Sequence, residues 1–135
     1  MPRASAVDAA RTAQRVLEIA TALFAERGFR EVSLEDVALA AGVTRGAVYH
    51  HYGSKAKLFA AVAAHLQARV AEAVVAAADA AGSSPTDQLR SGSHAFLDAI
   101  TTGDAVRVLL IDAPAVIGWQ EWRRLDAQNL SLIHI

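Results

Sequence analysis

The segment from Ser33 to Lys55 concentrates side chains that can donate hydrogen bonds to nucleic acid. Arg45 is the best candidate for reading a base, because its guanidinium fork can pair bidentately with O6 and N7 of guanine. A solvated arginine or a phosphate contact is the alternative. Tyr49 lies one helical turn after Arg45, so both side chains would project from the same face of a helix. Lys55 would lie in the first turn of a helix, where the backbone N–H groups and its own ammonium together favour a phosphate.

Other residues of this segment have a structural interpretation beside the nucleic-acid one. The hydroxyls of Thr44 and Ser33 can reach phosphates, but helix capping alone explains both, and for Ser33 we prefer capping. Gly46 in a helix interior costs about 1 kcal/mol relative to alanine, which either close approach to DNA or close packing on the first helix would explain. His50 is interpreted as a phosphate or base contact, and His51 as a structural hydrogen-bonding residue.

The sequence predicts neither a metal site nor a catalytic site. His50 and His51 would point about 100° apart on a helix, and neither has a second ligand three or four residues away. The chain has no Gly-x-Ser-x-Gly, no His-Glu-x-x-His and no dinucleotide-binding glycine pattern. We therefore expect no catalytic residues, no cofactor and no metal, and hence no enzyme.

Two short helices must position the candidate residues. Ser33 and Asp36 have the spacing of a capping box, which predicts a helix beginning at Ser33. Gly42 should end this helix, and Thr44 is placed to cap the next one through its side-chain oxygen. Two short helices joined by a glycine-containing turn form a helix-turn-helix, whose second helix can lie in a DNA major groove. The apolar side of the helix that begins at Ser33 should consist of Leu34, Val37, Ala38 and Ala41.

Several separately spaced residue types in this region agree with one known family. They are Leu23-Phe24-Ala-Glu-Arg-Gly28-Phe29, Val37-Ala38, Ala41-Gly42-Val43 and Gly46-Ala-Val-Tyr49-His-His51-Tyr52-Gly-Ser54-Lys55-Ala-Lys-Leu58. On these residues the chain resembles the TetR family of bacterial transcriptional regulators, over roughly half its length, from about Arg11 to Leu66. It departs from that family in two places, because members often have an aromatic residue where His50 stands and a proline where Gly53 stands.

The resemblance implies roles that the residues alone do not. The Tyr49 hydroxyl would contact a phosphate, with a core tyrosine as the alternative, whereas Tyr52 would pack in the core. A homodimer would bind a roughly palindromic double-stranded DNA operator, and the C-terminal helices would enclose a cavity for an unknown small-molecule effector. Candidate effector contacts are His94, Phe96, Trp119 and Trp122, although core packing explains each of them as well.

Composition favours an all-α, cytoplasmic protein. Hydrophobic residues make up 53% of the 135 residues, and no β-branched alternating run is present. The chain has no cysteine, no uncharged apolar stretch of membrane-spanning length and no signal-peptide core, so we expect no membrane partner. The formal net charge is −1, but residues 1–60 hold eight Lys or Arg against six acids, whereas the remainder holds five against eight. The more basic first part fits a DNA-facing segment.

The periodicity of apolar residues predicts seven helices in two domains. Residues 1–53 would form an N-terminal arm, mobile up to about Val7, and a three-helix DNA-binding domain; residues 54–135 would form a helical effector-binding and dimerisation domain. A linker at Gly82-Ser-Ser-Pro85 should separate the fourth helix from the fifth. Each helix should bury one stripe of apolar residues. The stripes are Ala13, Leu17, Ala20 and Phe24 in the first helix; Leu58, Val62, Leu66, Val70, Ala73 and Ala77 in the fourth; Leu89, Phe96, Leu97 and Ile100 in the fifth; and Val106, Leu109, Leu110 and Ala113 in the sixth. Pro114 should end or kink the sixth helix.

The last residues, Leu130-Ser-Leu-Ile-His-Ile135, are apolar without a polar periodic partner. Because the resemblance implies two further long helices, we expect the C-terminal domain to be truncated relative to a complete family member; a short natural variant is the alternative. We interpret the chain as a sequence-specific DNA-binding regulator, a ligand-responsive repressor. The alternatives are an activator, a helix-turn-helix module for protein contacts, and a small helical ligand-binding protein or enzyme whose N-terminus is only a scaffold.

Overall fold

The computed structural model describes the backbone of residues 2–130 and the side chains of all of these except 2–5, 119, 125–126 and 129–130. Every regular element in this range is helical, which confirms the all-α expectation. The elements are α1 (Pro2–Arg27), α2 (Leu34–Ala41), α3 (Arg45–Tyr52), α4 (Lys55–Ala80), α5 (Pro85–Thr101), the π-helical segment η1 (Val106–Asp112), α6 (Ala113–Ile117) and α7 (Trp119–Leu130). They form two compact units, residues 1–62 and residues 63–135, and the division falls inside α4.

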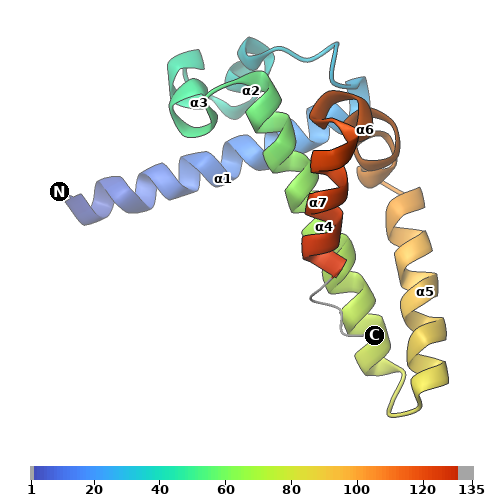
Figure 1. The fold of residues 1–135 in the computed structure, drawn as a ribbon. Coiled ribbons are helices and arrows are strands. Elements are labelled where there is room, and N and C mark those ends of the chain that lie inside the picture. The colour runs from blue at the N-terminus through green and yellow to red at the C-terminus, as the bar shows by residue number, and fades with distance from the viewer. Residues whose placement is uncertain (1, 131–135) are drawn as a thin grey trace. The chain divides into compact units, whose positions relative to one another are not determined.

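The N-terminal unit comprises α1, α2, α3 and the start of α4 (Figure 1). An aromatic cluster joins α1, α4 and the segment before α2. The Phe59 ring lies edge-on to the rings of Phe24 and Phe29, with 5.1 Å between the centroids in each pair. Phe24 and Phe59 are completely buried. Aliphatic side chains from all four helices complete this core: Val16, Ala20, Val32, Val37, Ala38, Ala41, Val48, Leu58 and Val62.

The first helix differs from its prediction at the start and in its buried stripe. It begins at Pro2, so residues 2–7 are helical rather than a separate mobile arm. Proline is tolerated in a first helical turn, because its missing N–H would have no partner there, and no breaker follows it. Val16 is fully buried where Leu17 was expected, since Val16, Ala20 and Phe24 follow at intervals of four and form one continuous ridge.

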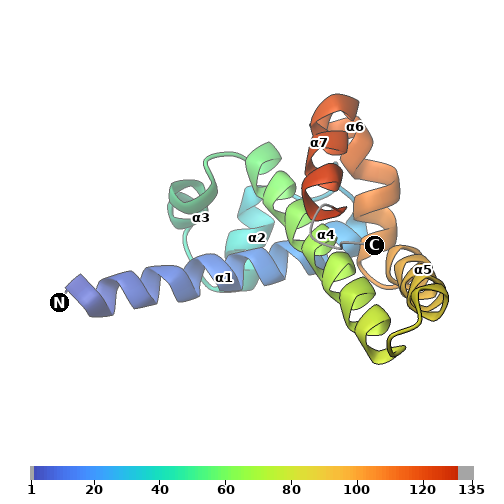
Figure 2. The same cartoon turned by 60° about the horizontal axis from the view of Figure 1, so that its bottom comes forward.

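The C-terminal unit comprises the second part of α4, then α5, η1, α6 and α7. Ser84 caps α5 by accepting a hydrogen bond from the Asp87 amide, and Pro85 occupies its first position as predicted. In both views α5 runs back alongside the end of α4 (Figures 1 and 2). The predicted stripe of α5 is wrong at Leu89 and Leu97, which are more than half exposed, whereas Gly92 is buried.

The predicted sixth helix is not one regular α-helix. The backbone between Val106 and Asp112 is π-helical, and the Ala113 amide donates to the carbonyl of Val108, five residues back. Pro114 follows at the second position of α6, where it lacks an N–H and would crowd the preceding carbonyls of a regular helix. The wider turn relieves that crowding and shifts the buried face to Val108 and Leu109, so the expected burial of Leu110 is wrong.

One helix among the described residues, α4, is long and apolar enough to cross a membrane by length and composition. Half of its most apolar stretch is buried within the structure, as in a core helix, and the helix carries Arg69 and Glu72. This helix is therefore weak support for a membrane span. In the predicted seam of α4, Leu58, Val62, Leu66 and Val70 are buried, but Ala73 is exposed and Val74 is buried instead.

Candidate nucleic-acid interface

The helix-turn-helix forms as the sequence predicts. Ser33 is the N-cap of α2, and Gly42 ends that helix with φ of 71°, a left-handed conformation that glycine adopts without strain. Thr44 caps α3, where its Oγ1 accepts a hydrogen bond from the Ala47 amide at 3.0 Å. Only the three residues 42–44 separate the two helices, so the start of α3 is fixed relative to α2 at both ends of the turn.

One side of α3 is anchored in the core and the other faces solvent. Val48 is fully buried in the N-terminal core. Ala47, His51 and Tyr52 are partly buried, and the other residues of the helix are exposed. A short helix that is anchored on one side and presents a polar outer face is suited to insertion into a major groove. The exposed residues at the start and centre of this face are Thr44, Arg45, Gly46, Tyr49 and His50.

The two tyrosines of the segment have different environments. Tyr49 is 63% exposed, so it is not the core tyrosine that was its alternative interpretation. Tyr52 is partly buried and its hydroxyl donates to the carbonyl of Ala13 in α1 at 2.8 Å, which agrees with the packing role predicted for it. Burial raises the pKa of the Tyr52 phenol, so this hydroxyl stays protonated as the donor. Tyr49 is therefore the tyrosine whose hydroxyl is accessible to a ligand.

Gly46 is not required by packing within the protein. A Cβ built at this position would meet only the Oγ1 of Thr44, at an ordinary contact distance of 3.8 Å. Close packing on the first helix, one of the two explanations for this glycine, therefore does not apply. Close approach of α3 to DNA is the explanation that remains a prediction.

We expect Gly46→Ala to raise the stability of the isolated chain by about 1 kcal/mol, because alanine is the better helix former and the site is open. The same added methyl group should weaken DNA binding by keeping the helix from the duplex. Chemical denaturation and a mobility-shift titration measure the two effects. Higher stability with unchanged DNA affinity would remove Gly46 from the interface.

Lys55 is positioned by an aromatic ring as well as by its helix. Its ammonium lies 4.2 Å from the centroid of the Phe29 ring, and the side chain is partly buried. Ser54 caps α4 through a hydrogen bond from the Lys57 amide to its Oγ at 3.1 Å. A cation at the start of a helix, held in place by a ring, is pre-oriented for an anion.

Lys55→Ala should lower the affinity for every DNA sequence by the same factor, because a phosphate contact carries no sequence information. The slope of log affinity against log salt should become shallower by about 0.9, the value for one phosphate contact. Arg90→Ala is a matched control, since it removes one exposed cation from the C-terminal unit. Equal slopes for the Lys55 variant and the unaltered chain would exclude Lys55 from the interface.

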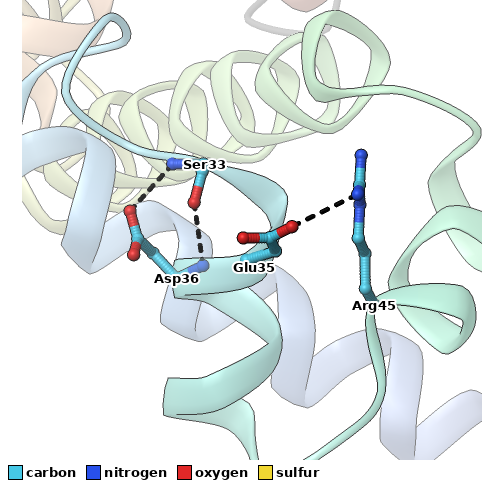
Figure 3. Close-up of polar contacts among 4 residues, drawn as sticks. All are labelled: Ser33, Glu35, Asp36 and Arg45. Atoms are coloured by element: carbon cyan, nitrogen blue, oxygen red, sulfur yellow. Dashed lines mark hydrogen bonds and ion pairs between the residues drawn. The ribbon is translucent and has the colours of Figure 1, made fainter.

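Ser33 and Asp36 form the predicted capping box. The Asp36 amide donates to Ser33 Oγ and the Ser33 amide donates to Asp36 Oδ2, each at 3.0 Å (Figure 3). The capping interpretation of Ser33 is thus confirmed, and a phosphate contact from its hydroxyl stays a prediction. The hydrogen bond from the Ser33 backbone, followed by that from its hydroxyl, lowers the pKa of Asp36.

The depressed pKa of Asp36 predicts how its contribution depends on pH. Because the carboxylate is favoured in the folded state, its stabilisation of α2 is fully present above the ordinary aspartate pKa and is lost as pH falls through the lower, folded value. NMR titration of the Asp36 carboxyl carbon should find that lower value. In Ser33→Ala the pKa should rise only part of the way, because the backbone donor remains; an ordinary pKa in the unaltered chain would contradict the capping geometry.

The sequence did not reveal the ion pair between α2 and α3. Nη1 of Arg45 lies 3.2 Å from Oε1 of Glu35 in the first turn of α2, and the side chains are 67% and 72% exposed (Figure 3). Such an exposed pair contributes about 0–1 kcal/mol to stability. The two residues are ten apart in sequence, so only the angle between the helices of a helix-turn-helix could have indicated the contact.

A recess of about 390 Å³ lies between these elements. Three cations, Arg30, Arg45 and Lys55, line it together with three acids, Glu31, Glu35 and Asp36. The predicted DNA contacts Ser33, Arg45 and Lys55 are therefore brought to one place on the N-terminal unit. Tyr49, Gly46 and His50 lie outside this recess, on the exposed face of α3.

The two adjacent histidines of α3 contact each other. The rings of His50 and His51 lie edge-to-face with centroids 5.4 Å apart, and the described residues contain no group of three metal-ligating side chains. For His51 the described contact is this ring rather than the hydrogen bond predicted for it. His50 is exposed, as a residue facing DNA would be.

The predicted effector residues do not gather at one described site. His94 is exposed, Phe96 and Trp122 are partly buried, and the side chain of Trp119 lies outside the described residues. A recess of about 350 Å³ in the C-terminal unit is lined instead by α4, the end of α5 and the residues that follow, including Leu66, Arg69, Thr102 and Asp104. Effector contacts by the four predicted residues stay a prediction.

These features define a helix-turn-helix protein with an additional helical unit. They are the buried Val48 beneath an exposed polar helix, the glycine turn and the two helix caps. Residues 16–62 match the family described as bacterial regulatory proteins of the tetR family, and residues 86–134 match the tetracyclin repressor-like C-terminal domain. The chain belongs to the TetR family.

Individual relatives agree with this assignment. The chain is 42% identical over 62 residues to the HTH-type transcriptional regulator AcrR of Shigella flexneri, covering 46% of this chain and 29% of that protein. It is 44% identical over 61 residues to the HTH-type transcriptional repressor AcnR of Corynebacterium efficiens, covering 45% and 32%. The matched part of the chain thus spans about a third of the length of these curated relatives.

Solved structures extend the likeness to both units. A TetR-family transcriptional regulator from Pectobacterium atrosepticum superposes with a TM-score of 0.74 at 29% identity, covering 93% of this chain and 70% of that one. The ketosteroid transcriptional regulator KstR2 of Mycobacterium tuberculosis has a TM-score of 0.68 at 24% identity, over 89% of this chain and 61% of that one, and so shows the fold alone.

Proposed function

We propose that this chain binds a DNA operator through α3 and acts as a ligand-responsive transcriptional repressor. The observation that carries the proposal is the outer face of α3, where Arg45 and Tyr49 are exposed one turn apart above the buried anchor Val48. Arg45 would pair with a guanine, Tyr49 would contact a phosphate, and Lys55 would hold a second phosphate beside them.

Charge and family support the same function. The first 60 residues carry eight Lys or Arg against six acids, whereas the remainder carries five against eight. The tetR-family match covers residues 16–62, and a relative named as a transcriptional repressor is 44% identical over 61 residues. We further propose a homodimer, because two α3 helices about 34 Å apart would read the two halves of a palindromic operator, and a cytoplasmic location, where that DNA lies.

The C-terminal unit is proposed to bind the effector. Its recess combines apolar walls from Leu66 and Val70 with the polar groups of Arg69, Thr102 and Asp104, the mixture typical of a small-molecule site. A ligand held there would alter the separation of two recognition helices in a dimer.

Selection of duplexes from a random DNA pool, followed by mobility shifts on the selected sequence and on DNA upstream of the gene, tests the proposal. We expect a selected sequence that binds at least about a thousandfold more tightly than scrambled DNA at physiological salt. Log affinity should fall linearly with log salt. Failure to select any sequence, with equal binding to scrambled DNA, would favour a protein-interaction or ligand-binding module instead.

A further inference from the structure

Several acids line the recess beside α2 and α3. Among the residues that the structure describes, Glu35 is the one of these acids whose side chain connects the two helices. Asp36 is engaged by Ser33 in the capping box, and Glu31 makes no ion pair with a described side chain. Glu35 instead reaches across to Arg45, with 3.2 Å between Oε1 and Nη1 (Figure 3). The residue that best fits base readout is therefore already held by a carboxylate in the free protein.

A carboxylate in the first turn of α2 favours the helix dipole, but neither that effect nor attraction to DNA requires it to pair with Arg45. Both side chains are mostly exposed, so the pair contributes little to the fold. Glu35 also adds negative charge beside Arg30, Arg45 and Lys55, on a surface that would face phosphates. It therefore opposes binding through phosphate contacts, on which binding to non-specific DNA depends. Specificity is a difference of affinities, so this opposition improves discrimination where binding to the selected sequence also uses base contacts that Glu35 does not weaken.

We propose that Glu35 is a specificity-determining residue that acts through Arg45, an inference that rests on the proposed function. Glu35 occupies Nη1 and leaves the other guanidinium donors of Arg45 open, which orients the fork for a base edge. The paired charges nearly cancel, so Arg45 attracts phosphates weakly and contributes to binding mainly where a base supplies directed acceptors.

The test compares Glu35→Gln with Glu31→Gln, which removes the same charge from the same recess without breaking an ion pair. Dissociation constants are measured on the selected sequence and on scrambled DNA of equal length at several salt concentrations. Glu35→Gln should raise affinity for scrambled DNA roughly fivefold, the effect of one unit charge near 4 Å in water. It should also steepen the salt slope by about 0.9, because Arg45 becomes free to contact a phosphate.

The deciding quantity is the selectivity ratio, which is the affinity for the selected sequence divided by the affinity for scrambled DNA. It should fall about fivefold in Glu35→Gln and stay unchanged in Glu31→Gln. In an Arg45→Ala background, Glu35→Gln should have no effect on the ratio, because Glu35 acts only through Arg45.

Each contrary outcome has a distinct meaning. Equal selectivity ratios for the two glutamine variants would overturn the inference. A loss of thermal stability in Glu35→Gln with no change in the ratio would also overturn it, because Glu35 would then act on the helix dipole of α2. An effect that persists without Arg45 would show that Glu35 contacts DNA itself and would overturn the positioning role. If the unaltered chain does not discriminate between the two DNAs, the proposed function itself fails.

Discussion

Arg45→Ala should reduce the ability of the chain to distinguish its selected sequence from scrambled DNA. We expect binding to the selected sequence to weaken by about 1–3 kcal/mol more than binding to scrambled DNA, the usual value of a bidentate pair with guanine. The position supports this size, because Arg45 is the first residue of α3 and its side chain is 67% exposed. Mobility-shift titrations on both DNAs measure the difference.

Arg30→Ala provides the matched control. Arg30 lines the same recess and is exposed, but it precedes α2 and so lies off the recognition helix. Its removal should weaken binding to both DNAs alike, through loss of charge. If Arg45→Ala behaves as Arg30→Ala does, Arg45 contacts a phosphate and the base contact must be assigned to another residue of α3.

The parts of the site that could be predicted from sequence depend on residues within four positions of each other. The Ser33–Asp36 capping box, the left-handed Gly42 and the Thr44 cap all formed as expected, because each is decided by local backbone geometry. These three features fix the length of α2, the turn and the start of α3. That is enough to place Arg45 at the N-terminus of a recognition helix.

The contacts that could not be predicted join residues distant in sequence. The Tyr52 hydroxyl meets a carbonyl 39 residues away, the Lys55 ammonium lies over the ring of Phe29, and Glu35 pairs with Arg45 across two helices. Each depends on the angle at which helices cross, which apolar periodicity does not specify. The sequence therefore indicated which residues could contact DNA, but not which neighbouring side chains fix the positions of those residues.

Periodicity was also a poor guide to which apolar residues are buried. Leu89 and Leu97 in α5 were expected to be buried and are more than half exposed. Leu39, which lies outside the predicted apolar side of α2, is 84% exposed. Phe24, by contrast, is completely buried. All four have similar hydrophobicity, so their energetic importance is decided by position in the fold rather than by residue type.

Phe24→Ala should unfold the N-terminal unit at physiological temperature and with it abolish DNA binding. The ring is completely buried, lies edge-on to Phe59 at 5.1 Å and is 6.0 Å from Phe29, so alanine would leave a cavity inside the aromatic cluster. Truncation of a buried phenylalanine costs about 3–5 kcal/mol, a large fraction of the roughly 5–15 kcal/mol that stabilises a typical domain. Leu39→Ala is the control and should change stability by less than about 0.5 kcal/mol, because its side chain is already in water. Urea denaturation followed by circular dichroism measures both variants. Comparable losses for the two substitutions would mean that the aromatic cluster is not what stabilises the N-terminal unit.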